Sequence, residues 1–197
     1  MLENGGAIER RVYRAYWNDG LLDIFAAAGV FAIGIFWLYD LPVGAVFVPV
    51  WLVPAWGPCR RHFIEPRLGM VEFSDARQRR NNNLLRLILY VGIGCLVIGI
   101  ELYLLRDRLG TNPSMTLIAG LPAVLLAVLA VATAALIATP RFLVYAAVLA
   151  AAGVTGAVFG LQPGLILVVA GGGMAILAAG VLWSFVRDNP VVAEDDL

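Results

Sequence analysis

The chain has no lysine, one histidine and two cysteines among its 197 residues. Without lysine it cannot form the glycine-rich phosphate-binding loop, which requires a lysine, and no serine stands in a nucleophile motif. Cys59 and Cys95 are expected at different depths, so they imply no disulfide framework. Cys59, His62 and Glu65 recur at intervals of three, but no fourth ligand follows to complete a zinc site. The sequence therefore predicts no catalytic residue, no cofactor and no metal.

Charge is also scarce: 14% of the residues are charged and 61% are hydrophobic, whereas about a quarter of a soluble domain is charged. The mean hydropathy of +0.85 is that of an integral membrane protein. Since one crossing needs about 20 apolar residues, we predict an all-α membrane domain over residues 1–197 with six spans. The predicted spans are 21–39, 41–56, 84–105, 115–138, 142–161 and 164–186.

The second predicted span is short and contains Pro42, Pro49 and Pro54. Each proline removes a backbone hydrogen bond that neighbouring helices or water must replace. A kinked crossing and a re-entrant hairpin are both possible. We favour the full crossing, because a hairpin would place the two main groups of arginines on opposite sides of the membrane.

Arginine supplies all 14 basic residues, and twelve of them fall on one side of the six predicted spans. Seven of these twelve lie between residues 60 and 86, and Arg106 and Arg108 fall on the opposite side. Cytoplasmic loops are enriched in arginine, so we predict that both termini are cytoplasmic. The first apolar run lacks a small-residue cleavage site, which indicates a retained signal anchor.

The polar segment 57–83 is predicted to form a small cytoplasmic cap between the second and third spans. Residues 62–65 and 70–73 are short runs of apolar and β-favouring residues on either side of Pro66 and Gly69. This pattern suggests a β-hairpin with a glycine in its turn. A helix capped by Ser74 or Asp75 would then lead into the third span.

The loop resembles a segment of the form Pro-Arg-x-Gly-x-Val-x-Phe in uncharacterised bacterial multi-span membrane proteins. The matching residues are Pro66, Arg67, Gly69, Val71 and Phe73. The family pattern has tyrosines in place of Glu65 and Met70 and a basic residue in place of Glu72. The resemblance implies a multi-pass protein of a bacterial inner (plasma) membrane and supplies no activity.

Two classes of function remain. The leading hypothesis is a non-enzymatic scaffold or accessory subunit that binds a protein partner or anionic lipid headgroups, and no nucleic acid, through its arginine-rich loop. The alternative is a small transporter or lipid-handling protein, motivated by the kinked second span, the glycine-rich last span and Glu101. Glu101 is the one candidate for an intramembrane polar site, whereas Asp23 and Asp40 are interpreted as boundary residues. The candidate binding residues are Arg60, Arg61, Arg67, Arg77, Arg79 and Arg80.

The remaining segments yield structural predictions. Residues 7–18 are predicted as an interfacial helix, and residues 187–197 as an acidic disordered tail. Small residues recur four apart in the last three spans, which favours close helix packing within the chain or in a homo-oligomer. These residues are Ala119, Ala123, Ala127, Ala130, Ala134, Ala138, Ala152, Gly156 and Gly160, with Gly171, Gly172 and Gly173 in the last span.

Overall fold

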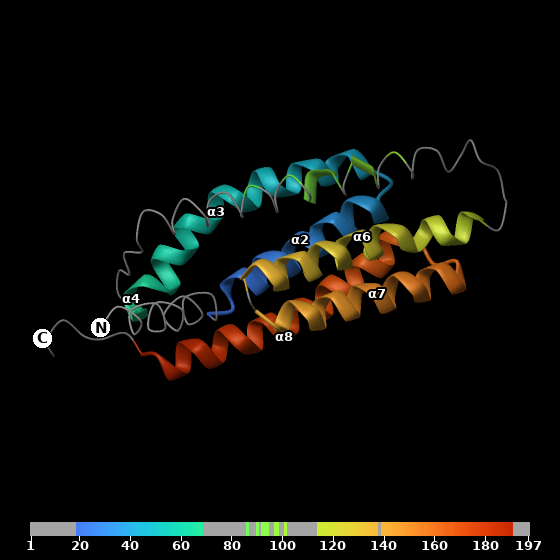
Figure 1. Cartoon of the computed structure of the whole chain (residues 1–197). Helices are drawn as coiled ribbons and strands as arrows, with labels where there is room; N and C mark the ends of the chain where they lie inside the picture. Colours follow the sequence, from blue (N-terminus) through green and yellow to red (C-terminus); the bar gives the residue numbers. More distant parts are fainter. Residues whose placement is uncertain are drawn as a thin grey trace, which may run out of the picture.

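The computed structural model describes residues 19–68, 86, 90, 92–94, 97, 98, 101, 114–137 and 139–190 (Figure 1). These residues form helices and no strands. The α-helices are α2 (Leu21–Leu38), α3 (Val48–Phe63), α4 (Glu65–Leu68), α6 (Ser114–Ile137), α7 (Arg141–Phe159) and α8 (Pro163–Asp188), and η1 (Pro42–Phe47) is a 3-10 helix. Among the described residues, five segments are long and apolar enough to cross a membrane. The predicted class, an all-α membrane protein, is confirmed.

Glycine, aspartate and proline set the helix ends. Gly20, with φ 81°, and Gly160, with φ 61°, take the left-handed conformation directly before α2 and directly after α7. Asp40 takes φ 55° in the turn after α2, a conformation that aspartate tolerates better than most residues. Pro163 opens α8, where its missing N–H costs no helical hydrogen bond.

Helices α2 and α8 form one close antiparallel pair. The Gln162 side chain, just before α8, donates a hydrogen bond to the Leu38 carbonyl at the end of α2 (3.4 Å). A Cβ on Gly34 would lie 2.6 Å from the Val168 nitrogen, and one on Gly171 would lie 2.6 Å from the Phe31 nitrogen. Glycines therefore let the two backbones approach more closely than any side chain would permit.

Helices α6 and α7 form the second close pair, along a seam of small residues. A Cβ on Gly153 would lie 2.8 Å from the Gly120 carbonyl oxygen and 3.3 Å from the Ala123 Cβ. Packing of small faces within the chain is confirmed for six of the predicted residues. The buried ones are Ala123, Ala127, Ala130, Ala134, Gly156 and Gly171.

The predicted second span is a broken helix that runs the length of the bundle. It begins as η1, continues as α3 through Pro54 and Pro58, and ends beside the start of α2. The helix extends seven residues beyond the predicted end at residue 56, so the first part of segment 57–83 is helical. The predicted hairpin is wrong in its first arm, because Phe63 ends α3 and Glu65 begins α4. The prolines lower helix propensity without ending the helix.

Several predictions concern residues that the structure does not describe. Residues 7–18, all of 69–83 and most of 84–105 lie outside the described part of the chain, although the described residues of 84–105 are helical. The predicted tail begins inside a helix, because α8 includes Arg187 and Asp188. Residues 191–197 also lie outside the described part.

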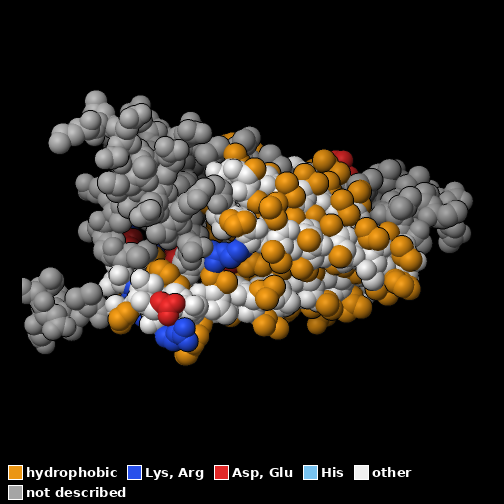
Figure 2. Space-filling model, turned by 60° about the horizontal axis from the view of Figure 1, so that its bottom comes forward, with side chains coloured by type: hydrophobic (Ala, Val, Ile, Leu, Met, Phe, Trp, Pro, Cys, Tyr) orange, Lys and Arg blue, Asp and Glu red, His pale blue; other side chains and the backbone are white. Residues whose placement is uncertain are grey.

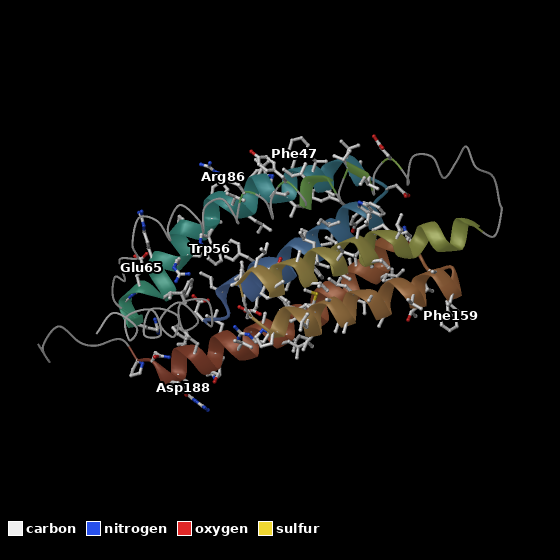
Figure 3. The ribbon with its side chains drawn as sticks, in the orientation of Figure 1. Phe47, Trp56, Glu65, Arg86, Phe159 and Asp188 are labelled. Atoms are coloured by element: carbon white, nitrogen blue, oxygen red, sulfur yellow. The ribbon has the colours of Figure 1, made fainter. Side chains whose placement is uncertain are left out.

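The described arginines outside the predicted third span gather at one end of the bundle. Figure 3 shows Glu65 and Asp188 near this end and Phe159 at the opposite end. Figure 2 shows a broad hydrophobic surface over the helices, with the visible arginine side chains on one half. We call the end of the bundle where these arginines gather the Arg-rich end. Its described arginines are Arg60, Arg61, Arg67, Arg141 and Arg187.

Candidate functional site: the Arg-rich end and the adjoining cavity

Asp19 forms a buried ion pair with Arg60 at the Arg-rich end. The Arg60 side chain reaches from the last turn of α3, and its Nη1 lies 3.4 Å from the Asp19 Oδ2. Asp19 also accepts a hydrogen bond from the backbone N–H of Leu21 (2.9 Å), one of the N–H groups of the first turn of α2 that have no partner within the helix. The guanidinium of Arg60 lies 5.8 Å from the centre of the Trp56 ring. This pair fixes the end of α3 against the start of α2.

Asp23 forms a second ion pair, in the first turn of α2. Its side chain is fully buried, and its Oδ2 lies 3.4 Å from Nη2 of Arg141, the first residue of α7. The Tyr145 side chain, one turn further along α7, interacts with the same carboxylate. Within the described part of the chain, neither oxygen of Asp23 has a hydrogen bond of good geometry. Asp23 is therefore held mainly by charge and by close packing.

The four charges of this cluster balance. Two carboxylates face two guanidiniums, and both closest N···O distances are 3.4 Å. A buried charge without a partner would cost several kcal/mol, so each residue requires its partner. The interpretation of Asp23 as a boundary residue was incomplete, because Asp23 is a buried link between α2 and α7. The cluster joins α2, α3 and α7 by charge.

The structure separates the six predicted binding residues. Arg60 is 6% exposed and paired with Asp19, so it does not belong to the exposed surface. Arg61 is exposed, and Arg67 is partly exposed and donates a hydrogen bond from Nη1 to the Phe63 carbonyl (3.1 Å). Arg77, Arg79 and Arg80 lie outside the described residues.

Glu101, the predicted intramembrane polar site, is helical and exposed. It is not among the residues that line the cavity described below. The buried carboxylates of the described chain are those of Asp19 and Asp23 instead. One signal could have indicated Asp23: it lies inside an otherwise apolar run, two residues after the start of that run.

A partly open apolar cavity of about 630 Å³ lies beside the ionic cluster. It is bordered by α2, α3, α6, α7 and α8 and by described residues of the predicted third span. Phe25 and Trp56 lie in its wall with their rings edge to face, 5.3 Å between centres. Tyr145 lines the cavity and also interacts with Asp23, so it connects the two sites. A cavity of this size is in the range of small-molecule and lipid sites.

No protein-family model, curated protein or solved structure matches this chain. The resemblance carried by Pro66 and Arg67 therefore stays a prediction.

The ionisation of Asp19 gives the protein a specific pH dependence. Burial raises the pKa of Asp19 above its ordinary value of 3.8, and this outweighs the Leu21 N–H and Arg60, which lower the pKa. The folded state thus holds the proton more tightly than the unfolded chain does. Protonation of Asp19 therefore stabilises the folded state. This contribution is complete below about pH 3.8 and is lost as the pH rises through the raised pKa of Asp19.

We expect Asp19→Asn to remove this dependence. The difference in melting temperature, variant minus wild type, should increase as the pH is raised from about 4 towards 7. Thermal unfolding of the detergent-purified protein across this range would measure it. Asp188→Asn is the matched control, because the Asp188 side chain is 58% exposed. Parallel profiles for wild type and Asp19→Asn would contradict the prediction.

Proposed function

We propose that this protein is a non-enzymatic accessory or scaffold component of a bacterial inner membrane, which binds anionic lipid headgroups through its Arg-rich end. The observation that supports the proposal is the division of labour among the arginines at this end. Arg60 and Arg141 face buried carboxylates, while Arg61 is exposed at the end of α3. The charge of Arg61 is therefore directed outward and not into the bundle.

Arg67 strengthens this surface. Its hydrogen bond to the Phe63 carbonyl holds the guanidinium against the end of α3. A side chain that is already ordered loses less entropy on binding than a free one. Arginine also binds phosphate with two parallel N–H donors, which lysine cannot do. Arg61 and Arg67 are thus suited to the phosphate of a lipid headgroup at the membrane surface.

Neutralising Arg61 and Arg67 together tests the proposal. Each arginine near a leaflet contributes roughly 1 kcal/mol of attraction to anionic lipid, so the double Arg→Gln variant should bind anionic headgroups roughly 30-fold less tightly. The measurement is lipid mass spectrometry of protein extracted from native membranes in mild detergent. Arg187→Gln is the matched control, since Arg187 already faces Asp188 at 3.3 Å.

Two results would redirect this proposal. Unchanged enrichment of anionic lipid in the double variant, with topology preserved, would overturn it. Loss of a stoichiometric protein from the same extracts, with lipid unchanged, would assign the surface to a protein partner. Extending the neutralisation to Arg77, Arg79 and Arg80 would show whether the rest of the predicted set contributes.

The second candidate is a lipid-handling protein or small transporter. The apolar cavity beside the Arg-rich end favours it, because such a site accepts an apolar ligand at the depth of the spans. Glu101, the polar residue that also motivated this candidate, is exposed and lies outside the cavity lining, so the cavity supports the candidate independently of it.

A further inference from the structure

We propose that the cavity binds a single acyl chain of an anionic membrane lipid, whose phosphate contacts Arg86. The inference deepens the proposed function, and it rests on that function only for the negative charge of the headgroup. The site for the chain follows from the shape and lining of the cavity alone.

The length of the cavity matches half a bilayer. Residues of α2 that line it recur along one face from Leu22 to Ile33. At 1.5 Å per residue this face is about 16 Å long, and one leaflet contributes about half of a hydrocarbon core of roughly 30 Å. Leu22 lies in the first turn of α2, at the Arg-rich end, and Ile33 lies deeper in the bundle. The cavity therefore extends from the Arg-rich end into the bundle over about the length that a single acyl chain occupies in one leaflet.

The chemistry of the lining fits a hydrocarbon chain. Nearly all of the described lining residues are aliphatic or aromatic, such as Val48, Leu126 and Leu149. The hydroxyl of Thr133 donates a hydrogen bond to the Leu129 carbonyl (2.9 Å), and Tyr145 interacts with Asp23. The Thr133 hydroxyl is thus already paired, and the mainly apolar described lining favours an apolar ligand over a polar one.

Arg86 supplies the charge at the cavity. It is exposed, it lines the cavity together with Trp56, and Figure 3 shows both in the half of the bundle nearer the Arg-rich end. A guanidinium at the edge of an apolar site can bind the phosphate of a lipid whose chain lies inside. Tryptophan is enriched at the level of the headgroups. The arrangement thus has an apolar interior and one cationic edge, which is the polarity of an anionic phospholipid.

Two glycines in the lining keep space open. A Cβ on Gly29 would lie 3.4 Å from Leu52 Cδ1, and one on Gly92 would lie 3.4 Å from Leu129 Cδ2. Both distances are ordinary van der Waals contacts, so each position accepts a side chain, and a larger one would extend into the cavity. Gly29→Leu and Gly92→Leu are therefore cavity-filling variants on two different helices. Gly173→Leu is the matched control, because Gly173 is exposed, is not in the lining, and has no atom near its Cβ.

The test is native mass spectrometry of the full chain, first stripped of lipid in detergent and then titrated with phosphatidylglycerol. Wild type and Gly173→Leu should bind one lipid molecule tightly, whereas Gly29→Leu and Gly92→Leu should bind it roughly tenfold more weakly or worse. Arg86→Gln should keep the chain site but lose roughly fivefold in its preference for phosphatidylglycerol over phosphatidylcholine. Glycerophosphate, which carries no acyl chain, should not compete.

The outcomes separate this inference from the proposed function. A wild-type protein that binds no lipid tightly, or cavity-filling variants that bind like wild type, would overturn the acyl-chain site. Competition by glycerophosphate would reassign Arg86 to a free phosphate ester. Because wild type itself must bind, the test holds even if a filled variant fails to fold. Loss of anionic enrichment in the Arg61 and Arg67 variant, with one chain still bound, would separate the surface from the cavity.

Discussion

Arg141→Met should destabilise the folded protein by about 3–5 kcal/mol, because it leaves a buried carboxylate without its counter-charge. Asp23 is fully buried, and the closest described guanidinium nitrogen is Arg141 Nη2 at 3.4 Å. Methionine preserves much of the volume of the arginine stem and removes only the charge. Unfolding in detergent, followed by circular dichroism or thermal shift, would measure the loss.

Two variants make this result specific. Arg187→Met removes a guanidinium from an exposed pair with Asp188 and should cost no more than a few tenths of a kcal/mol. The double variant Asp23→Leu with Arg141→Met replaces the buried pair by apolar residues and should recover most of the stability. If Arg141→Met costs no more than Arg187→Met, Arg141 does not hold the Asp23 carboxylate.

The partners of Asp23 and Asp19 could not be predicted from the sequence, although the membrane class could. Apolar runs of about 20 residues identify spans whatever their order in space. Arg60 pairs with Asp19 and Arg141 pairs with Asp23. These pairings depend on which helices are neighbours in space. The positive-inside pattern predicts that these residues lie on one side of the membrane. It carries no information on which of them point inward.

The segment around Phe63 shows a different limit. Its β-favouring residues and Pro66 suggested a hairpin, yet α3 continues to Phe63 and α4 follows. Propensity over four residues is weak evidence when a preceding helix can be extended by packing. At Arg60, the ion pair with Asp19 supplies such packing. Tertiary contact therefore outweighed local preference.

The cavity was likewise outside the reach of sequence reasoning. Its wall draws single faces from helices far apart in the chain, such as Phe25 on α2 and Phe142 on α7. Glycines at Gly29 and Gly92 cannot be told in sequence from glycines that pack against backbone, such as Gly171. Only the helix arrangement separates glycines that bring backbones together from glycines that keep space open.

This distinction predicts opposite effects at two adjacent positions of α8. A Cβ on Gly171 would lie 2.6 Å from the Phe31 nitrogen and 2.8 Å from its Cα, whereas one on Gly172 would meet no atom within 4 Å. The backbone of α2 cannot move aside as easily as the tip of a flexible side chain can. Gly171→Ala should therefore destabilise the protein by about 1–3 kcal/mol through overpacking. Gly172→Ala should be neutral or stabilise it by up to about 1 kcal/mol, because alanine favours the helix.

Gly34→Ala extends the test to the opposite helix, since its Cβ would meet the backbone of Val168 and Leu167. It should destabilise the protein as Gly171→Ala does. The double variant should cost less than the sum of the two single ones, because helices already forced apart by one methyl leave room for the second. Unfolding of all four variants in one detergent provides the comparison. Equal stability of Gly171→Ala and Gly172→Ala would show that α2 and α8 do not approach at backbone distance.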